Sequence, residues 1–116
     1  MTLDEFRLEM MLYRQSADEE SKSRKDPYIA LERLRTLYEK FGETERQMAD
    51  NVLSEWALSE DEQLRFDALA LINDFKIVSA TPDLQMLAIR LASDTAPSAP
   101  YELRKVQRII AELSGS

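Results

Sequence analysis

Helix-forming residues run through almost the whole chain and are interrupted only by short polar or proline-marked stops. Leu, Glu, Ala and Arg are among the most frequent residues, and the 116 residues include two glycines and four prolines. No run of β-branched residues occurs, so the composition favours helices over strands. The interruptions leave six amphipathic segments, and we therefore predict an all-α fold of about six helices.

Capping signals mark where these segments begin. Thr2 with Glu5, and Ser59 with Glu62, have the spacing of a capping box. Prolines open three other segments, at positions 27, 82 and 100. The predicted helices lie at about 2–16, 27–41, 43–58, 60–75, 81–92 and 100–113. The polar stretch 17–26 is predicted to be a linker after the first helix, within a single domain spanning 1–116.

The apolar positions of alternate segments superpose, as they do in helical repeat proteins. Shifts of 34 and then 38 residues align three segments, and a shift of 35 aligns two others. The first alignment pairs Leu34, Leu37, Tyr38 and Phe41 with Ala68, Leu71, Ile72 and Phe75, and then with Val106, Ile109, Ile110 and Leu113. Chance superposition of amphipathic helices is the alternative, but agreement across three helices favours a repeat.

Two of the segments carry apolar residues on both sides. In 60–75 these are Phe66 and Leu69, opposite the broad face that includes Leu71. In 81–92 they are Met86 and Ile89. A helix in the middle of a stack needs two apolar sides, so these two segments are predicted to form the central layer of a compact antiparallel helical stack.

The stretch LRFDALALINDFKIVSATPDLQMLAIRL resembles a HEAT repeat. The matching positions are Leu64, Arg65, Ala68, Ala80, Pro82 and Leu84. The resemblance is strongest over 60–92 and looser elsewhere. It implies a HEAT-like α-solenoid fragment, a family whose members serve mainly as protein-binding scaffolds, with some relatives that bind nucleic acid.

Negative charge is concentrated in the middle of the chain. The formal net charge is −7 and the isoelectric point about 4.6. Residues 43–83 hold ten acids and three bases, whereas the flanking segments nearly balance. This excess opposes binding to nucleic acid or anionic lipid and favours a basic protein partner.

An acidic strip on the segment 60–75 is the candidate binding surface. Glu60, Asp67 and Asp74 recur at heptad spacing and share the one side that the apolar faces leave open. The full candidate set is Asp50, Glu55, Glu60, Asp61, Gln63, Asp67 and Asp74. The alternative is an ordinary solvated face whose first acids stabilise a helix N-terminus. In being small and acidic the chain also loosely resembles immunity proteins of bacterial toxin systems, which implies that it neutralises a basic nuclease.

Catalysis is not expected. The chain contains no cysteine and no histidine, which removes thiol nucleophiles, imidazole bases and the usual zinc ligands. Carboxylates alone remain, without a glycine-rich phosphate loop, so we expect no cofactor and no metal site. No long apolar run occurs, and the predicted location is the cytoplasm.

The large apolar side chains leave a second function open. Trp56 is predicted to lie in the core, while Tyr28 and Tyr101 are predicted to expose their phenols. The first helix carries a second apolar stripe, Leu8, Met11 and Leu12, which could meet a neighbouring helix or a second copy of the chain. The leading hypothesis is a non-catalytic protein-binding module with an acidic surface. One alternative is a structural subunit that self-associates through the first helix and could form a homodimer. Another is a nucleic-acid-binding HEAT relative that uses basic side chains such as those of Arg104, Lys105 and Arg108.

Overall fold

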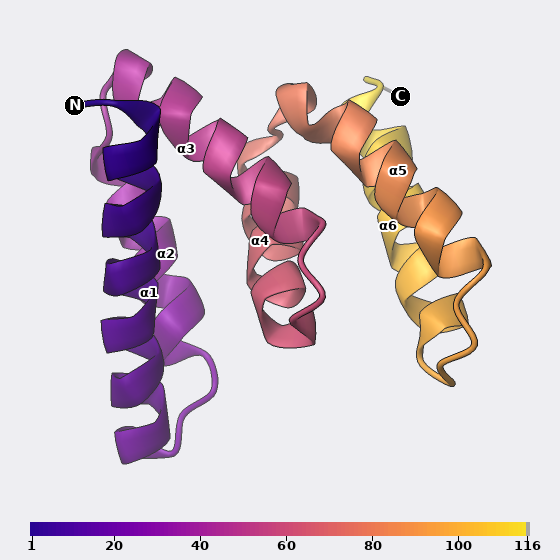
Figure 1. Cartoon of the computed structure of the whole chain (residues 1–116), viewed down its shortest axis with the longest axis horizontal. Helices are drawn as coiled ribbons and strands as arrows, with labels where there is room; N and C mark the ends of the chain where they lie inside the picture. The colour runs from indigo at the N-terminus through magenta and orange to yellow at the C-terminus, as the bar shows by residue number, and fades with distance from the viewer. Residues whose placement is uncertain (116) are drawn as a thin grey trace. The chain divides into compact units, whose positions relative to one another are not determined.

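The computed structural model describes residues 1–115, and that part of the chain is all-α, as predicted. It contains six α-helices, one short 3-10 turn and no strand (Figure 1). The elements are α1 (Leu3–Arg24), α2 (Ile29–Lys40), α3 (Glu43–Ala57), α4 (Glu62–Phe75), the turn η1 (Val78–Ala80), α5 (Thr81–Ala92) and α6 (Ala99–Leu113). None of these helices has the length and apolar character needed to cross a membrane.

The chain divides into two compact units, where the sequence predicted one domain. Unit 1 is Met1–Ala49 and unit 2 is Asp50–Ser116. The boundary falls inside α3, which contributes its first half to unit 1 and its second half to unit 2. Each unit therefore has its own set of helix packing contacts.

The predicted linker at 17–26 is wrong, because α1 continues without a break to Arg24. Ala17 and Ser21 extend the buried stripe of α1, and the Ser21 hydroxyl accepts a hydrogen bond of 2.8 Å from the Ala30 amide of α2. Polar residues of this stretch also form ion pairs: Glu20 with Arg33 of α2 at 2.8 Å, and Asp18 with Lys22 within α1 at 3.1 Å. The helix ends at Lys25, whose left-handed φ of 55° stops it.

In unit 1, α1 and α2 lie side by side and run in opposite directions (Figure 1). Aromatic side chains join them: the rings of Phe6 and Phe41 have centroids 5.2 Å apart, and Tyr38 contacts Phe41 at 6.4 Å. The guanidinium of Arg46, at the start of α3, lies 5.2 Å from the Tyr38 ring centroid. These contacts fix the short turn between α2 and α3.

The start of α1 agrees with its predicted cap, whereas the start of α4 shifts by two residues. Thr2 caps α1 as expected, accepting a hydrogen bond from the Glu5 amide. The N-cap of α4 is Asp61 instead of Ser59, and its carboxylate accepts bonds from the amides of Gln63 and Leu64. Aspartate is at least as good an N-cap as serine, so the competing cap prevails.

In unit 2, α5 and α6 pack against each other in opposite directions (Figure 1). Helix α6 also contacts α4. Buried leucines, isoleucine and valine form the shared core, including Ile72, Leu84, Leu87 and Val106. Trp56 is also buried, as predicted. The two-sided burial of α5 is wrong, since Met86 and Ile89 are exposed. On α4, Leu69 is buried but Phe66 is 42% exposed.

Candidate functional site

The structure breaks the predicted acidic strip at its centre. Asp67 is only 2% exposed, so its carboxyl group lies beneath other side chains instead of facing water. The Gln63 side-chain amide donates to its Oδ1 at 3.4 Å. The hypothesis of a binding surface centred on Asp67 is therefore wrong. Heptad spacing does place Asp67 on the same side of α4 as Asp74, but this side is buried at position 67 and exposed at position 74.

The other candidate residues fall into separate places. Glu60, Asp61 and Gln63 are exposed around the start of α4, whereas Asp74 is exposed near its end. Glu62 and Asp74 are about 18 Å apart along the helix axis at 1.5 Å per residue. Asp50 is half-buried and Glu55 exposed, both on α3. Only the acids at the start of α4 form a compact exposed group, together with Glu62.

Two arginines hold the loop that leads into α4. Arg65 donates from Nη1 to the carbonyls of Ser59 and Glu60, at 3.1 and 3.2 Å. Arg90 of α5 donates to the Leu58 carbonyl at 2.9 Å and to that of Ser59 at 3.4 Å. These bonds give hydrogen-bond donors to carbonyls of the loop between α3 and α4. The exposed acids at the start of α4 thus stand on a fixed backbone.

Arg65 also joins α4 to α6 through a nearly buried ion pair. Its Nε and Nη2 donate to the two carboxylate oxygens of Glu102 at 2.8 and 3.0 Å. The side chains are 12% and 15% exposed. The bond to Glu102 raises the pKa of Arg65, with burial acting in the opposite direction. This fork-like pairing fixes the spacing between α4 and α6.

A groove opens between α4 and α6, next to this ion pair. Its cavity volume is about 530 Å³. Leu69 lies at its apolar floor, and Phe66 and Tyr101 line it, with Tyr101 73% exposed. The remaining lining residues are Glu62, Gln63, Ser98, Glu102, Lys105 and Arg108. Two aromatic rings left open to water beside a concave surface are typical of a binding site.

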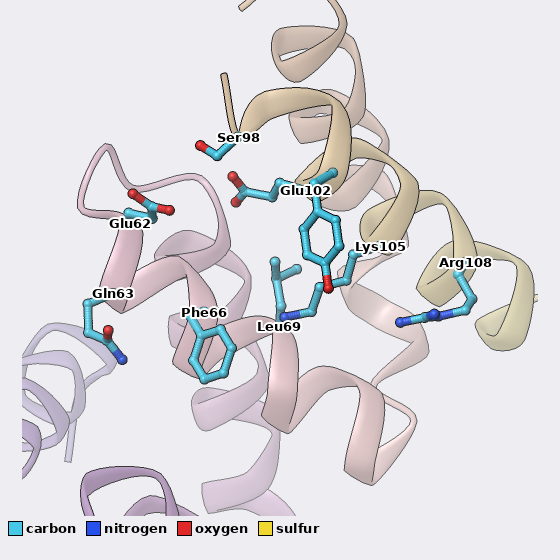
Figure 2. Close-up of a pocket in the computed structure, with 9 residues that line it drawn as sticks. Glu62, Gln63, Phe66, Leu69, Ser98, Glu102, Lys105 and Arg108 are labelled. Carbon is cyan, nitrogen blue, oxygen red and sulfur yellow. The ribbon is translucent and has the colours of Figure 1, made fainter. Parts of the chain in front are cut away.

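The two ends of the groove carry opposite charge. Glu62 and Glu102 lie near Ser98 at one end, and Lys105 and Arg108 lie toward the other (Figure 2). The Lys105 ammonium sits 4.4 Å from the Phe66 ring centroid. Burial lowers the pKa of Lys105, and nearby Arg108 lowers it further while Glu102 raises it. Lys105 is therefore a partly desolvated cation that an incoming anion would stabilise.

Comparisons with known proteins add no assignment. No protein family, curated protein or solved structure matches this chain. Its resemblance to HEAT repeats accordingly stays a prediction. Over residues 1–115 no group of three or more acidic side chains is placed to hold a metal ion. The arrangement fits recognition by shape and charge.

Sequence reasoning did not assemble the groove residues into one site. The sequence places Phe66 on the second apolar side of α4 and offers Lys105 and Arg108 only as contacts to nucleic acid. Tyr101, Lys105 and Arg108 recur at intervals of four and three residues, so they share one face of α6. That spacing was a usable signal. The predicted exposure of the Tyr28 and Tyr101 phenols is confirmed at the level of the whole side chain.

Proposed function

We propose that this chain is a non-catalytic protein-recognition module. It binds a basic protein partner through the α4–α6 groove and the acidic residues Glu60, Asp61 and Glu62 beside it. The observation that carries the proposal is the pair of exposed aromatic side chains, Phe66 and Tyr101, lining a groove next to these acids. We expect this binding to occur in the cytoplasm, as the sequence predicts.

Aromatic anchors and charge have separate roles in this proposal. Large aromatic side chains supply much of the binding energy where they become buried at an interface. Exposed acids at the rim chiefly attract an oppositely charged partner and accelerate association. The net charge of −7 acts in the same direction over longer distances. A basic nuclease, the partner implied by the resemblance to immunity proteins, has the required charge.

Charge reversal at the start of α4 tests the proposal. We expect Glu60→Lys with Glu62→Lys to weaken partner binding by about tenfold at physiological salt, mainly through a slower association rate. Asp61 is left unchanged because it caps α4. The measurement is quantitative mass spectrometry of proteins captured from a lysate of the source organism, followed by association kinetics with the captured protein.

The matched control is Glu9→Lys with Glu19→Lys, which makes the same change in net charge on the exposed face of α1. The control variant should still capture a basic protein that Glu60→Lys with Glu62→Lys no longer captures. Raising the salt concentration should release this basic protein from the wild type. Equal retention by the two variants would reject the acidic surface at α4.

Self-association through α1 is a second candidate function. Leu8 and Leu12 are 60% and 55% exposed, and their spacing of four residues places them on one face of the helix. This is the second apolar stripe expected from the sequence, although Met11 is half-buried and contributes less to it.

Substitution within this stripe distinguishes a dimer from a monomer. If α1 forms the contact, Leu12→Glu should shift the protein to monomers, because a carboxylate would be buried in an apolar interface. Sedimentation velocity across a dilution series measures the shift, with Gln107→Glu at an exposed position of α6 as the control. A wild type that sediments as a monomer at every concentration would eliminate this function.

A further inference from the structure

We propose that the α4–α6 groove receives a short amphipathic helix of the partner, lying antiparallel to α4, with acidic residues in its first turn and basic residues in its last. This inference rests on the proposed function and specifies the chemistry and direction of the bound segment. It follows from the two charged ends of the groove, its helical walls and its apolar floor.

A helix suits the walls better than an extended peptide does. An extended segment usually gains affinity by hydrogen bonding to the edge of a sheet. Residues 1–115 contain no strand, so no such edge is present in that part of the chain. A helix satisfies its own backbone hydrogen bonds and needs from the groove only side-chain contacts, which two neighbouring helices can provide as ridges and grooves.

The dimensions of the groove set the length of the bound segment. Its lining on α6 runs from Ser98 to Arg108, about 15 Å at 1.5 Å per residue. A helix of about ten residues, or nearly three turns, spans that distance. One apolar face of such a helix would cover Leu69, Phe66 and Tyr101.

Charge complementarity gives the segment its polarity. Glu62 lies at one end of the groove, with exposed Glu60 and Asp61 immediately before it in the chain. Lys105 and Arg108 lie toward the opposite end (Figure 2). The carboxylate of Glu102 is already paired with Arg65, so it does not neutralise Lys105 fully. The bound helix therefore places basic side chains near Glu62 and acidic ones near Lys105 and Arg108.

Helix dipoles fix the direction in which the chain of the bound helix runs. Both α4 and α6 begin at the Glu62 end of the groove and run the same way (Figure 1). An antiparallel helix would place its C-terminus, the negative end of its dipole, beside their positive N-termini. Basic residues are favoured in the last turn of a helix and acidic ones in the first. Dipoles and side-chain charges thus select the same orientation.

Selection from a displayed library of random 14-residue peptides tests this proposal on the full-length protein. We expect the enriched peptides to carry aromatic or leucine residues at intervals of three and four, acids in the first turn and bases in the last. A synthetic copy of the most enriched peptide should lose at least about tenfold in affinity for Lys105→Glu with Arg108→Glu, measured by fluorescence anisotropy. The same peptide with its acidic and basic turns exchanged should bind the wild type about tenfold more weakly.

Arg104→Glu with Lys40→Glu is the matched control, because both side chains are exposed outside the groove and the change in net charge is identical. Peptides that respond to Glu60→Lys with Glu62→Lys but not to Lys105→Glu with Arg108→Glu would overturn the helix orientation while leaving the proposed function standing. Peptides indifferent to both pairs would overturn both. Failure to enrich any peptide would overturn the helix proposal alone, since lysate capture tests the function independently.

Discussion

Replacing Asp67 with lysine is expected to lower the free energy of unfolding by about 3–5 kcal/mol, because an ammonium group would be enclosed where only 2% of the side chain is exposed. The longer side chain must also displace its neighbours in a packed interior. Urea denaturation followed by circular dichroism measures the loss. If the variant is already unfolded without denaturant, the loss of its helical far-ultraviolet circular dichroism signal shows the same destabilisation.

The matched control is Asp74→Lys, at an exposed site on the same helix. We expect a change within about 0.5 kcal/mol there, because surface substitutions rarely exceed that amount. A lysine in the last turn also complements the helix dipole. Similar stability of the two variants would mean that Asp67 is open to solvent, as the uninterrupted acidic strip required.

Removing the guanidinium of Arg65 is expected to cost about 3 kcal/mol, since Arg65→Met leaves the Glu102 carboxylate nearly buried without its partner. The carbonyls of Ser59 and Glu60 would lose the same donor. Arg65→Lys should recover only part of the loss, because an ammonium cannot form the two-pronged contact of a guanidinium. Urea unfolding of the single variants provides the comparison.

The double variant Arg65→Met with Glu102→Met separates pairing from burial. Replacing both charges by apolar groups removes the unpaired carboxylate, so the double variant should be more stable than Arg65→Met alone. Additive losses in the two single variants would show that the side chains do not act as a pair.

Local sequence signals predicted most of the helices. The Thr2 cap, the prolines and the loss of amphipathic pattern near Gly42 and Ser93 gave six helices in the correct order. These signals did not predict that α1 continues over 17–24. The residues buried there, Ala17 and Ser21, are small, and hydropathy does not distinguish them from residues of a solvated linker. Only their spacing, which continues the stripe of Phe6 and Met10, pointed to a longer α1.

The candidate site was predictable only in part. The acids at the start of α4 are exposed as the sequence suggested, since residues before and at a helix N-terminus usually face solvent. Asp67 could not be placed, because the side of α4 that carries it is covered by long-range packing that helical periodicity does not encode. Lys105 and Phe66 are 39 positions apart in the chain, so their contact depends on the packing of α6 against α4.

Photo-crosslinking shows whether a protein partner binds at the α4–α6 groove. A benzophenone amino acid replaces Tyr101, which lines the groove. As the control, it replaces Ile89 of α5, which is equally exposed but does not line the groove. In a lysate of the source organism, we expect a discrete crosslinked protein from position 101 that is absent from position 89. The variant Glu60→Lys with Glu62→Lys should lose this crosslinked protein. Crosslinking of a protein from position 89 and not from position 101 would rule out binding at the groove.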